Sequence, residues 1–260
     1  MRLLLIKLYN SFRSNGFFLM LYHCLRYPIL RLKTTVIRRK IFSANDENEI
    51  FKKIYEMNWW GSNESISGHG STLNYTENLR KELPIIFDKF SIHKVFDAPC
   101  GDFNWMIKVI KKNNIKYLGA DIVESLIKHN NTLFSNDRIK FIHLNILKDE
   151  FPEADIWICR DFFIHLSYHD IYRSLLSYSN STIPYILTTS HINLSGFKNM
   201  DIRTGDARVI DLFSEPFFFP KRYKYKIEDW VKPHPPREMI LFSRNQIAQL
   251  LPKMKKAIRF

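Results

Sequence analysis

The chain has 260 residues, 45% of them hydrophobic and 25% charged, and carries a formal net charge of +13 at pH 7. This length and apolar content suffice for one domain with a full core, and they exclude a chain that is disordered throughout. Cys24, Cys100 and Cys159 are widely spaced, so they support neither a disulfide framework nor a zinc or other metal site, and a reducing, cytoplasmic compartment is expected.

The basic charge is concentrated at the N-terminus. Residues 1–45 hold nine Lys or Arg and no acidic residue, which leaves +4 for the other 215 residues. The apolar clusters there are shorter than the ~18 residues that cross a bilayer, and no signal-peptide cleavage site follows. We therefore expect a basic amphipathic extension over residues 1–45 and one domain over residues 46–260. Residues 1–40 suit an anionic membrane surface, at the inner membrane face, as well as packing on their own domain.

A helix and a loop open the expected domain. The pair Asn45-Asp46 can cap a helix that runs to about Met57. Residues 58–72 are rich in Gly and Ser but begin with two tryptophans, which is more aromatic surface than a plain linker carries. We interpret them as a lid over a ligand, with an ordinary surface loop as the alternative. Thr76 is expected to cap the next helix, which runs to Phe90 with Pro84 at a kink or restart.

The stretch from Lys94 to Met106 predicts a strand, a tight turn and a helix. A short apolar strand ends at Asp97, and Pro99 and Gly101 then force a turn where a ligand can approach the helix start. A second strand ends at Asp121, 24 residues beyond Asp97. That spacing is typical of the acidic residue that holds ribose hydroxyls in dinucleotide-binding folds.

Two more strands are predicted, over residues 139–146 and 154–159. The second is followed by Arg160, Asp161 and His165, and then by Ser167, which opens a helix in a capping-box pattern. In doubly wound sheets the ligand lies beyond the carboxyl ends of the strands, where the strand order reverses. Asp161 and His165 fall there, so each is a candidate general base. In the alternative interpretation Arg160 pairs with Asp161 and His165 caps the helix.

Three motifs together carry a family resemblance: Asp-Ala-Pro-Cys-Gly-Asp-Phe-Asn-Trp-Met, Gly-Ala-Asp-Ile-Val, and Cys-Arg-Asp with His165. From Trp59 to Arg244 the chain resembles a bacterial branch of the class I S-adenosylmethionine-dependent methyltransferases. The resemblance implies an α/β, Rossmann-like sheet of seven mostly parallel strands with helices on both faces. It departs from the broad class in the turn, where Pro99 and Phe103 replace two of three glycines.

The resemblance also implies a site for S-adenosylmethionine at the ends of the first three strands. Asn145 would face the adenine amino group, and the loop over residues 58–72 would cover the donor. The expected donor contacts are Asp97, Ala98, Pro99, Cys100, Gly101, Asp102, Trp105, Asp121, Ile122, Asn145, Ile146 and Arg160.

The remaining chain predicts a fifth strand over 185–190, closing antiparallel strands over 227–231 and 239–243, and a basic C-terminal helix. Between them, residues 191–219 form a long polar and aromatic loop. We assign it to acceptor recognition, and the alternative is an insertion that covers the core with Phe217, Phe218 and Phe219.

Three functions remain open on these grounds. The favoured one is O-methylation of a sugar or another small or glycan-borne acceptor, as in surface-polysaccharide pathways. A nucleic-acid methyltransferase is the second, although most of the excess positive charge lies outside the expected catalytic domain. The third is a nicotinamide-dependent oxidoreductase or a non-catalytic nucleotide-binding module, which the loss of two glycines from the turn disfavours.

Overall fold

The computed structural model describes residues 32–44 and 46–258. Of the expected basic extension, residues 1–31 and 45 lie outside the described residues, so its expected membrane role stays a prediction. The chain divides into two compact units, Met1–Lys53 and Ile54–Phe260. In the first, a helix covers residues 32–41, and α3 (Glu47–Glu56) begins where Oδ1 of Asp46 accepts a hydrogen bond from the Glu49 amide at 3.0 Å, as predicted. Within the described residues, no helix combines the length and apolar character needed to cross a bilayer.

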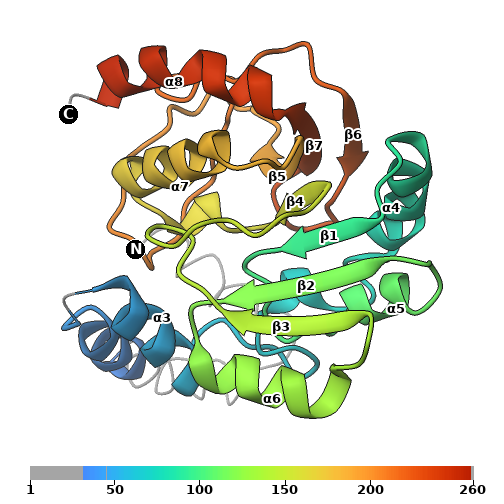
Figure 1. Ribbon diagram of the computed structural model, residues 1–260. Coiled ribbons are helices and arrows are strands. Elements are labelled where there is room, and N and C mark those ends of the chain that lie inside the picture. The colour runs from blue at the N-terminus through green and yellow to red at the C-terminus, as the bar shows by residue number, and fades with distance from the viewer. Residues whose placement is uncertain (1–31, 45, 259–260) are drawn as a thin grey trace, which may run out of the picture. The chain divides into compact units, whose positions relative to one another are not determined.

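The second unit is built on one sheet of seven strands in the order β3-β2-β1-β4-β5-β7-β6 (Figure 1). The strands are β1 (Lys94–Asp97), β2 (Lys116–Asp121), β3 (Ile139–His143), β4 (Ile156–Cys159), β5 (Tyr185–His191), β6 (Tyr225–Glu228) and β7 (Arg237–Ser243). β1 to β5 pair in parallel, whereas β7 runs antiparallel to both β5 and β6. The predicted fold class is confirmed, and the closing strands begin at Tyr225 and Arg237, slightly earlier than expected.

Helices cover both faces of this sheet. They are α4 (Glu77–Lys89), α5 (Met106–Ile110), α6 (Glu124–Phe134), α7 (Tyr168–Asn180) and α8 (Arg244–Ile258). Thr76 precedes α4, but its hydroxyl donates to the Thr72 carbonyl and does not cap the helix, which corrects the predicted cap. Pro84 lies inside α4 without dividing it.

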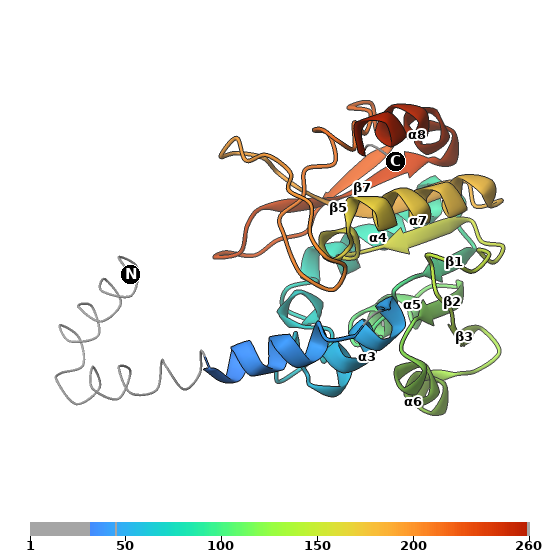
Figure 2. The same cartoon turned by 90° about the vertical axis from the view of Figure 1, so that its left-hand side faces the viewer.

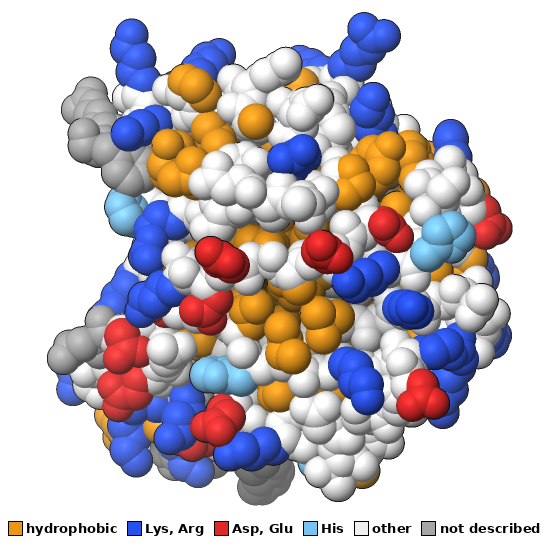
Figure 3. All heavy atoms as spheres, in the orientation of Figure 1, with side chains coloured by type: hydrophobic (Ala, Val, Ile, Leu, Met, Phe, Trp, Pro, Cys, Tyr) orange, Lys and Arg blue, Asp and Glu red, His pale blue; other side chains and the backbone are white. Residues whose placement is uncertain are grey.

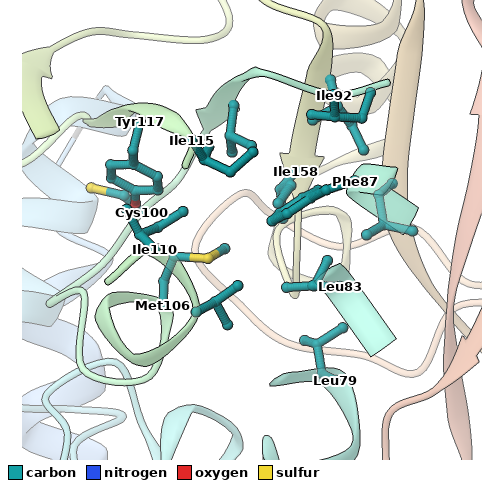
Figure 4. Packing of buried hydrophobic residues seen from close by; sticks show 14 of the residues in the cluster. Leu79, Leu83, Phe87, Ile92, Cys100, Met106, Ile110, Ile115, Tyr117 and Ile158 are labelled. Carbon is teal, nitrogen blue, oxygen red and sulfur yellow. The ribbon is translucent and has the colours of Figure 1, made fainter. Parts of the chain in front are cut away.

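One face of the sheet packs against α4, α5 and α6. Leu83 and Phe87 of α4 lie beside Ile158 of β4, and Met106 of α5 lies nearby in the same apolar cluster (Figure 4). The side chains that face this cluster alternate along each strand, as β-strand geometry requires. In β1, for example, Val95 belongs to the cluster.

The other face is filled by aromatic side chains beneath α7 and α8, which lie side by side (Figures 1 and 2). Phe96, the residue after Val95, meets the ring of Phe151 edge-on at 5.5 Å. Trp157 of β4 contacts Tyr178 of α7 and donates from Nε1 to the Ala98 carbonyl at 2.8 Å. This hydrogen bond ties the buried ring to the chain where it leaves β1.

The connection between β5 and β6 leaves the sheet as a long loop (orange in Figure 2). Phe217 and Phe219 are buried, and Phe219 meets Phe242 of β7 edge-on at 5.0 Å. The alternative interpretation, that part of this loop covers the core, therefore holds for Phe217 and Phe219, whereas Phe218 is only half-buried.

Substituting Ser167 tests the start of α7. Its Oγ accepts a hydrogen bond from the Asp170 amide at 3.1 Å, which is the cap that the sequence predicts. We expect Ser167→Ala to lower the free energy of unfolding by about 0.5–2 kcal/mol in urea denaturation, because an amide of the first turn loses its partner. Ser179→Ala, late in the same helix, is the control. Equal unfolding midpoints for the two variants would contradict the cap.

Candidate functional site

The strand order brings several predicted residues to one edge of the sheet. β1 lies between β2 and β4, and the chain proceeds outward from β1 to β3 on one side and from β4 to β5 on the other. Parallel sheets bind ligands beyond their carboxyl ends at such a reversal. Asp97 ends β1 and Asp121 ends β2, while Arg160 and Asp161 follow β4.

The turn after β1 is held by groups from β2 and α6. Gly101 has a positive φ of 55°, and its amide donates to Oδ2 of Asp121 at 3.2 Å. Asn130, buried on α6, donates from Nδ2 to the Gly101 carbonyl at 2.8 Å. Oδ1 of Asp121 accepts from the Val123 amide at 3.1 Å. Burial nonetheless raises the pKa of Asp121 to about 6, because amide hydrogen bonds do not replace its full hydration.

Asp97 is a buried carboxylate with one open oxygen. Oδ2 accepts a hydrogen bond from the Tyr117 hydroxyl at 2.7 Å. Within residues 32–44 and 46–258, Oδ1 has no hydrogen-bond partner. This oxygen is not completely enclosed by protein atoms. Burial raises the pKa of Asp97 to about 7. The side chain therefore offers a free acceptor atom at the carboxyl edge of the sheet.

The Gly- and Ser-rich loop closes directly on this turn. The carboxylate of Asp102 accepts hydrogen bonds from Ser65 Oγ at 2.8 Å, the Ile66 amide at 3.0 Å and Ser67 Oγ at 3.2 Å. A Cβ at Gly101 would lie only 2.3 Å from Ser67 Oγ, so glycine is required here by the loop as well as by φ. These contacts occupy the carboxylate of Asp102, and a direct contact between Asp102 and the donor stays a prediction.

The same loop also contacts the segment after β4. The indole of Trp60 stacks on the imidazole of His165, with ring centroids 4.1 Å apart and planes 24° apart. The Gly70 carbonyl accepts from Nη2 of Arg160 at 2.8 Å. Residues 58–72 thus touch both sides of the reversal between β1 and β4, a placement that favours the lid interpretation.

Arg160 lies in a buried network of ion pairs. Its Nε and Nη2 donate to the two oxygens of Asp229 at 2.9 and 3.0 Å. Arg237 in turn lies 2.9 Å from Oδ2 of Asp161, and the predicted pair of Arg160 with Asp161 is a longer contact of 3.4 Å. The sequence did not predict Asp229 or Arg237 as part of this network. Asp229 directly follows β6 and Arg237 is the first residue of β7, and no local motif links either residue to Arg160.

Asp161 is held rigidly and is a weak base. Its backbone has a positive φ of 53°, and its amide donates to Thr189 Oγ1 at 2.8 Å. Burial alone would raise the pKa of Asp161, but the guanidinium groups of Arg237 and Arg160 outweigh burial and lower it. A carboxylate with a lowered pKa has little tendency to accept a proton.

His165 has the better arrangement for accepting a proton. Burial lowers the pKa of His165, so the imidazole is neutral near pH 7. Its Nδ1 lies 2.8 Å from the Asp206 carbonyl. Nδ1 must carry the proton in that hydrogen bond, which leaves Nε2 as an acceptor. No hydrogen-bond partner of Nε2 exists in the described part of the chain. The alternative that His165 caps the helix is wrong, because Ser167 does so.

The remaining predicted contacts lie around the turn. β3 ends at His143, so Asn145 lies two residues beyond the strand and not within it as predicted. Its Oδ1 accepts from the Leu147 amide at 2.9 Å, and its role at an adenine stays a prediction. Ala98, Cys100, Trp105 and Ile146 are buried, and Pro99 and Ile122 are partly buried.

Neither a protein-family model nor a curated protein matches the sequence. Solved structures do match. A methyltransferase from Leishmania major aligns over 78% of this chain and 89% of its own, at 13% identity and a TM-score of 0.59. Human N-acetylserotonin methyltransferase in complex with S-adenosylmethionine gives 15% identity over 79% of this chain and 61% of its own, with a TM-score of 0.52.

A third similar structure is magnesium protoporphyrin IX methyltransferase from Synechocystis with bound S-adenosylhomocysteine. It aligns over 76% of this chain and 100% of its own, at 12% identity and a TM-score of 0.52. This chain has the class I methyltransferase fold. Because all three identities are low, the likeness concerns the fold, and the site must be argued from this chain's own residues.

Removing the carboxylate of Asp102 tests how the loop is held. We expect Asp102→Ala to increase hydrogen exchange of residues 62–72 and to lower the free energy of unfolding by about 1–3 kcal/mol, because buried donors lose a charged acceptor. Asp137→Ala, at an exposed position, is the matched control. Unchanged exchange in the loop of Asp102→Ala would show that other contacts hold it.

Proposed function

We propose that the protein is an S-adenosylmethionine-dependent methyltransferase that methylates a hydroxyl oxygen of a small or glycan-borne acceptor. One arrangement carries the proposal. Two buried carboxylates, Asp97 and Asp121, end neighbouring strands on one side of the reversal, and His165 with its open Nε2 lies on the other.

The chemistry of these groups fits the donor. The carboxylate of Asp121 has about four acceptor positions, and the amides of Gly101, Ile122 and Val123 take three of them, so it can also accept a hydrogen bond from a ribose hydroxyl. The open Oδ1 of Asp97 suits the ammonium group of the methionyl part, because a buried carboxylate gains most from a cationic partner. Two of the similar structures contain S-adenosylmethionine or S-adenosylhomocysteine, which supports this assignment.

When bound, the donor supplies an electrophilic methyl group. The protein's part is to orient the acceptor and take its proton. In the proposed mechanism Nε2 of His165 accepts the hydroxyl proton, while the Asp206 carbonyl holds the Nδ1 proton and fixes the ring orientation. The indole of Trp60 covers one face of the imidazole. The negative charge of Asp161 raises the pKa of His165 against the effect of burial, so Asp161 supports the base from a fixed position.

The acceptor class rests on the long loop between β5 and β6. Residues 204–208 lie against the segment around His165, since the Gly205 amide donates to the His165 carbonyl at 2.7 Å. A sugar hydroxyl of a surface glycan remains the proposed acceptor, and a cytoplasmic enzyme at the inner membrane face would fit a lipid-borne glycan. On the face shown in Figure 3, Lys and Arg side chains are interspersed with Asp and Glu and do not form one basic stripe, so that face gives no support to a nucleic-acid acceptor.

The pKa values of the carboxylates give a pH test of donor binding. The pKa of Asp97 is about 7 and that of Asp121 about 6, both raised by burial. Only the ionised form of Asp97 attracts an ammonium group, and only the ionised form of Asp121 keeps its full capacity to accept a hydroxyl hydrogen bond. We expect the affinity for S-adenosylmethionine, measured by calorimetry, to be highest near about pH 7.5 and to fall by about tenfold or more towards about pH 5.5.

Methylthioadenosine, which lacks the amino-acid part, is the matched ligand. Its affinity should fall only as the pH passes through about 6, where Asp121 is protonated. Asp97→Asn should weaken S-adenosylmethionine binding and leave methylthioadenosine binding nearly unchanged. If the wild-type protein does not bind S-adenosylmethionine at any pH in this range, the proposed function is wrong.

The assignment of the base is tested by two variants. We expect His165→Ala to reduce methyl transfer by roughly 10²–10⁴-fold with donor affinity near that of the wild type, because the general base is lost. Asp161→Asn should cause a smaller loss. Transfer is measured with S-adenosylmethionine labelled in the methyl group and glycans extracted from cells that lack this gene. Full activity of His165→Ala would require a different base.

A further inference from the structure

Arg208 is a half-buried cation without a carboxylate partner among the described residues. Two of its guanidinium nitrogens, Nε and Nη1, are fully enclosed and make no hydrogen bond with any described residue. Its third nitrogen, Nη2, makes one long hydrogen bond of 3.4 Å to the Phe163 carbonyl. Within residues 32–44 and 46–258, no acidic side chain comes within 4.0 Å of the Arg208 guanidinium.

Among the described residues, the half-buried Arg80 and Arg244 each leave Nε enclosed and unpaired but donate to a backbone carbonyl, at 2.8 and 2.7 Å. The two fully buried arginines are paired with carboxylates. Arg160 binds both oxygens of Asp229, and Arg237 lies within 3.6 Å of both Asp229 and Asp161. Around Arg208, by contrast, the nearest compensation is the ring of Tyr168, 5.2 Å from the guanidinium carbon, and the more distant charge of Asp201. Burial lowers the pKa of Arg208 to about 10, which still leaves it charged at neutral pH.

An uncompensated buried charge costs folding free energy, and folded proteins normally pair such a group or place it at the surface. A face-on aromatic ring offsets only part of the cost. The side chain as a whole is partly exposed. The hydrogen bond at Nη2 is long and therefore weak, so a ligand can easily replace it.

The position of Arg208 links it to the proposed base. Its amide donates to the Ile164 carbonyl at 3.1 Å, next to His165, and its positive charge lowers the pKa of His165. Any anion that Arg208 binds would therefore lie close to the hydroxyl that His165 deprotonates.

We propose that Arg208 is a specificity-determining residue that binds an oxyanion, a carboxylate or a phosphate, carried by the methyl acceptor near the reacting hydroxyl. This inference rests on the proposed function and narrows the acceptor to an anionic molecule, such as a uronic acid or a sugar phosphate. The nitrogen that can meet the oxyanion is Nη2, which donates to it in place of its hydrogen bond to Phe163.

The test measures binding of D-glucuronate, of inorganic phosphate and of neutral methyl α-D-glucoside to the full chain by calorimetry. The wild-type protein should bind at least one of the two oxyanions saturably and about tenfold more tightly than the glucoside. The two anionic arms distinguish a carboxylate from a phosphate acceptor. Arg208→Gln should lose roughly ten- to a hundredfold in oxyanion affinity. Arg203→Gln, an exposed position on the same loop, should retain it.

Arg208→Lys keeps the charge but not the planar guanidinium that places Nη2, so its oxyanion affinity should fall between those of the wild type and Arg208→Gln. This variant decides the matter if Arg208→Gln does not fold. The inference is overturned if the wild-type protein binds no oxyanion, or if the Arg208 variants bind it as well as the wild type. A parallel titration with S-adenosylmethionine separates the proposed function from the proposed role of Arg208. If the protein binds the donor but no oxyanion, the proposed function stands and only the anionic acceptor class is wrong.

Discussion

The position of β1 between β2 and β4 is the constraint on which the site depends. From β1 the chain adds β2 and β3 on one side of the sheet, and it then adds β4 and β5 on the other side. The connections therefore diverge, so helices do not cover the carboxyl ends of the central strands. The loop over residues 58–72, which precedes β1, supplies the cover. Its serines bind Asp102 on one side and its Trp60 stacks on His165 on the other. The topology thus brings these groups to one edge of the sheet, and one loop contacts both sides of the reversal.

The buried ion pairs make the wall beyond β4 rigid. Arg160 joins the loop carbonyl of Gly70 to Asp229, and Arg237 joins Asp229 to Asp161. Such a network is a weak source of net stability, because desolvation offsets most of the attraction. Its effect is geometric. It holds Asp161 in a left-handed backbone conformation and keeps its charge at a fixed position near His165, where that charge raises the pKa of the imidazole.

Much of the fold could be predicted because its signals are local. The apolar strands, the cap at Ser167, and the carboxylates at the ends of β1 and β2 follow from residues adjacent in the sequence. The end of β3 was misplaced because the side chain of Asn145 takes the Leu147 amide, and such a local hydrogen bond competes with the strand ladder. The partners of Arg160 and of Asp102 could not be predicted, since Asp229 and Ser65 lie 69 and 37 residues away and only the folded chain brings them together.

The charges at the site act on stability in opposite directions. Burial raises the pKa values of Asp97 and Asp121, so these groups favour the folded state most when protonated, and they oppose folding increasingly as the pH rises towards their folded pKa values of about 7 and about 6. The pKa of Asp161 is lowered by its arginines, so its contribution is present at neutral pH and is lost in acid. At neutral pH the fold therefore retains two carboxylates at a cost in stability that neutral side chains would avoid. Under the proposed function, the ammonium group of the donor offsets this cost at Asp97 and a ribose hydroxyl offsets it at Asp121, which would be a reason to keep acids at the ends of two adjacent central strands.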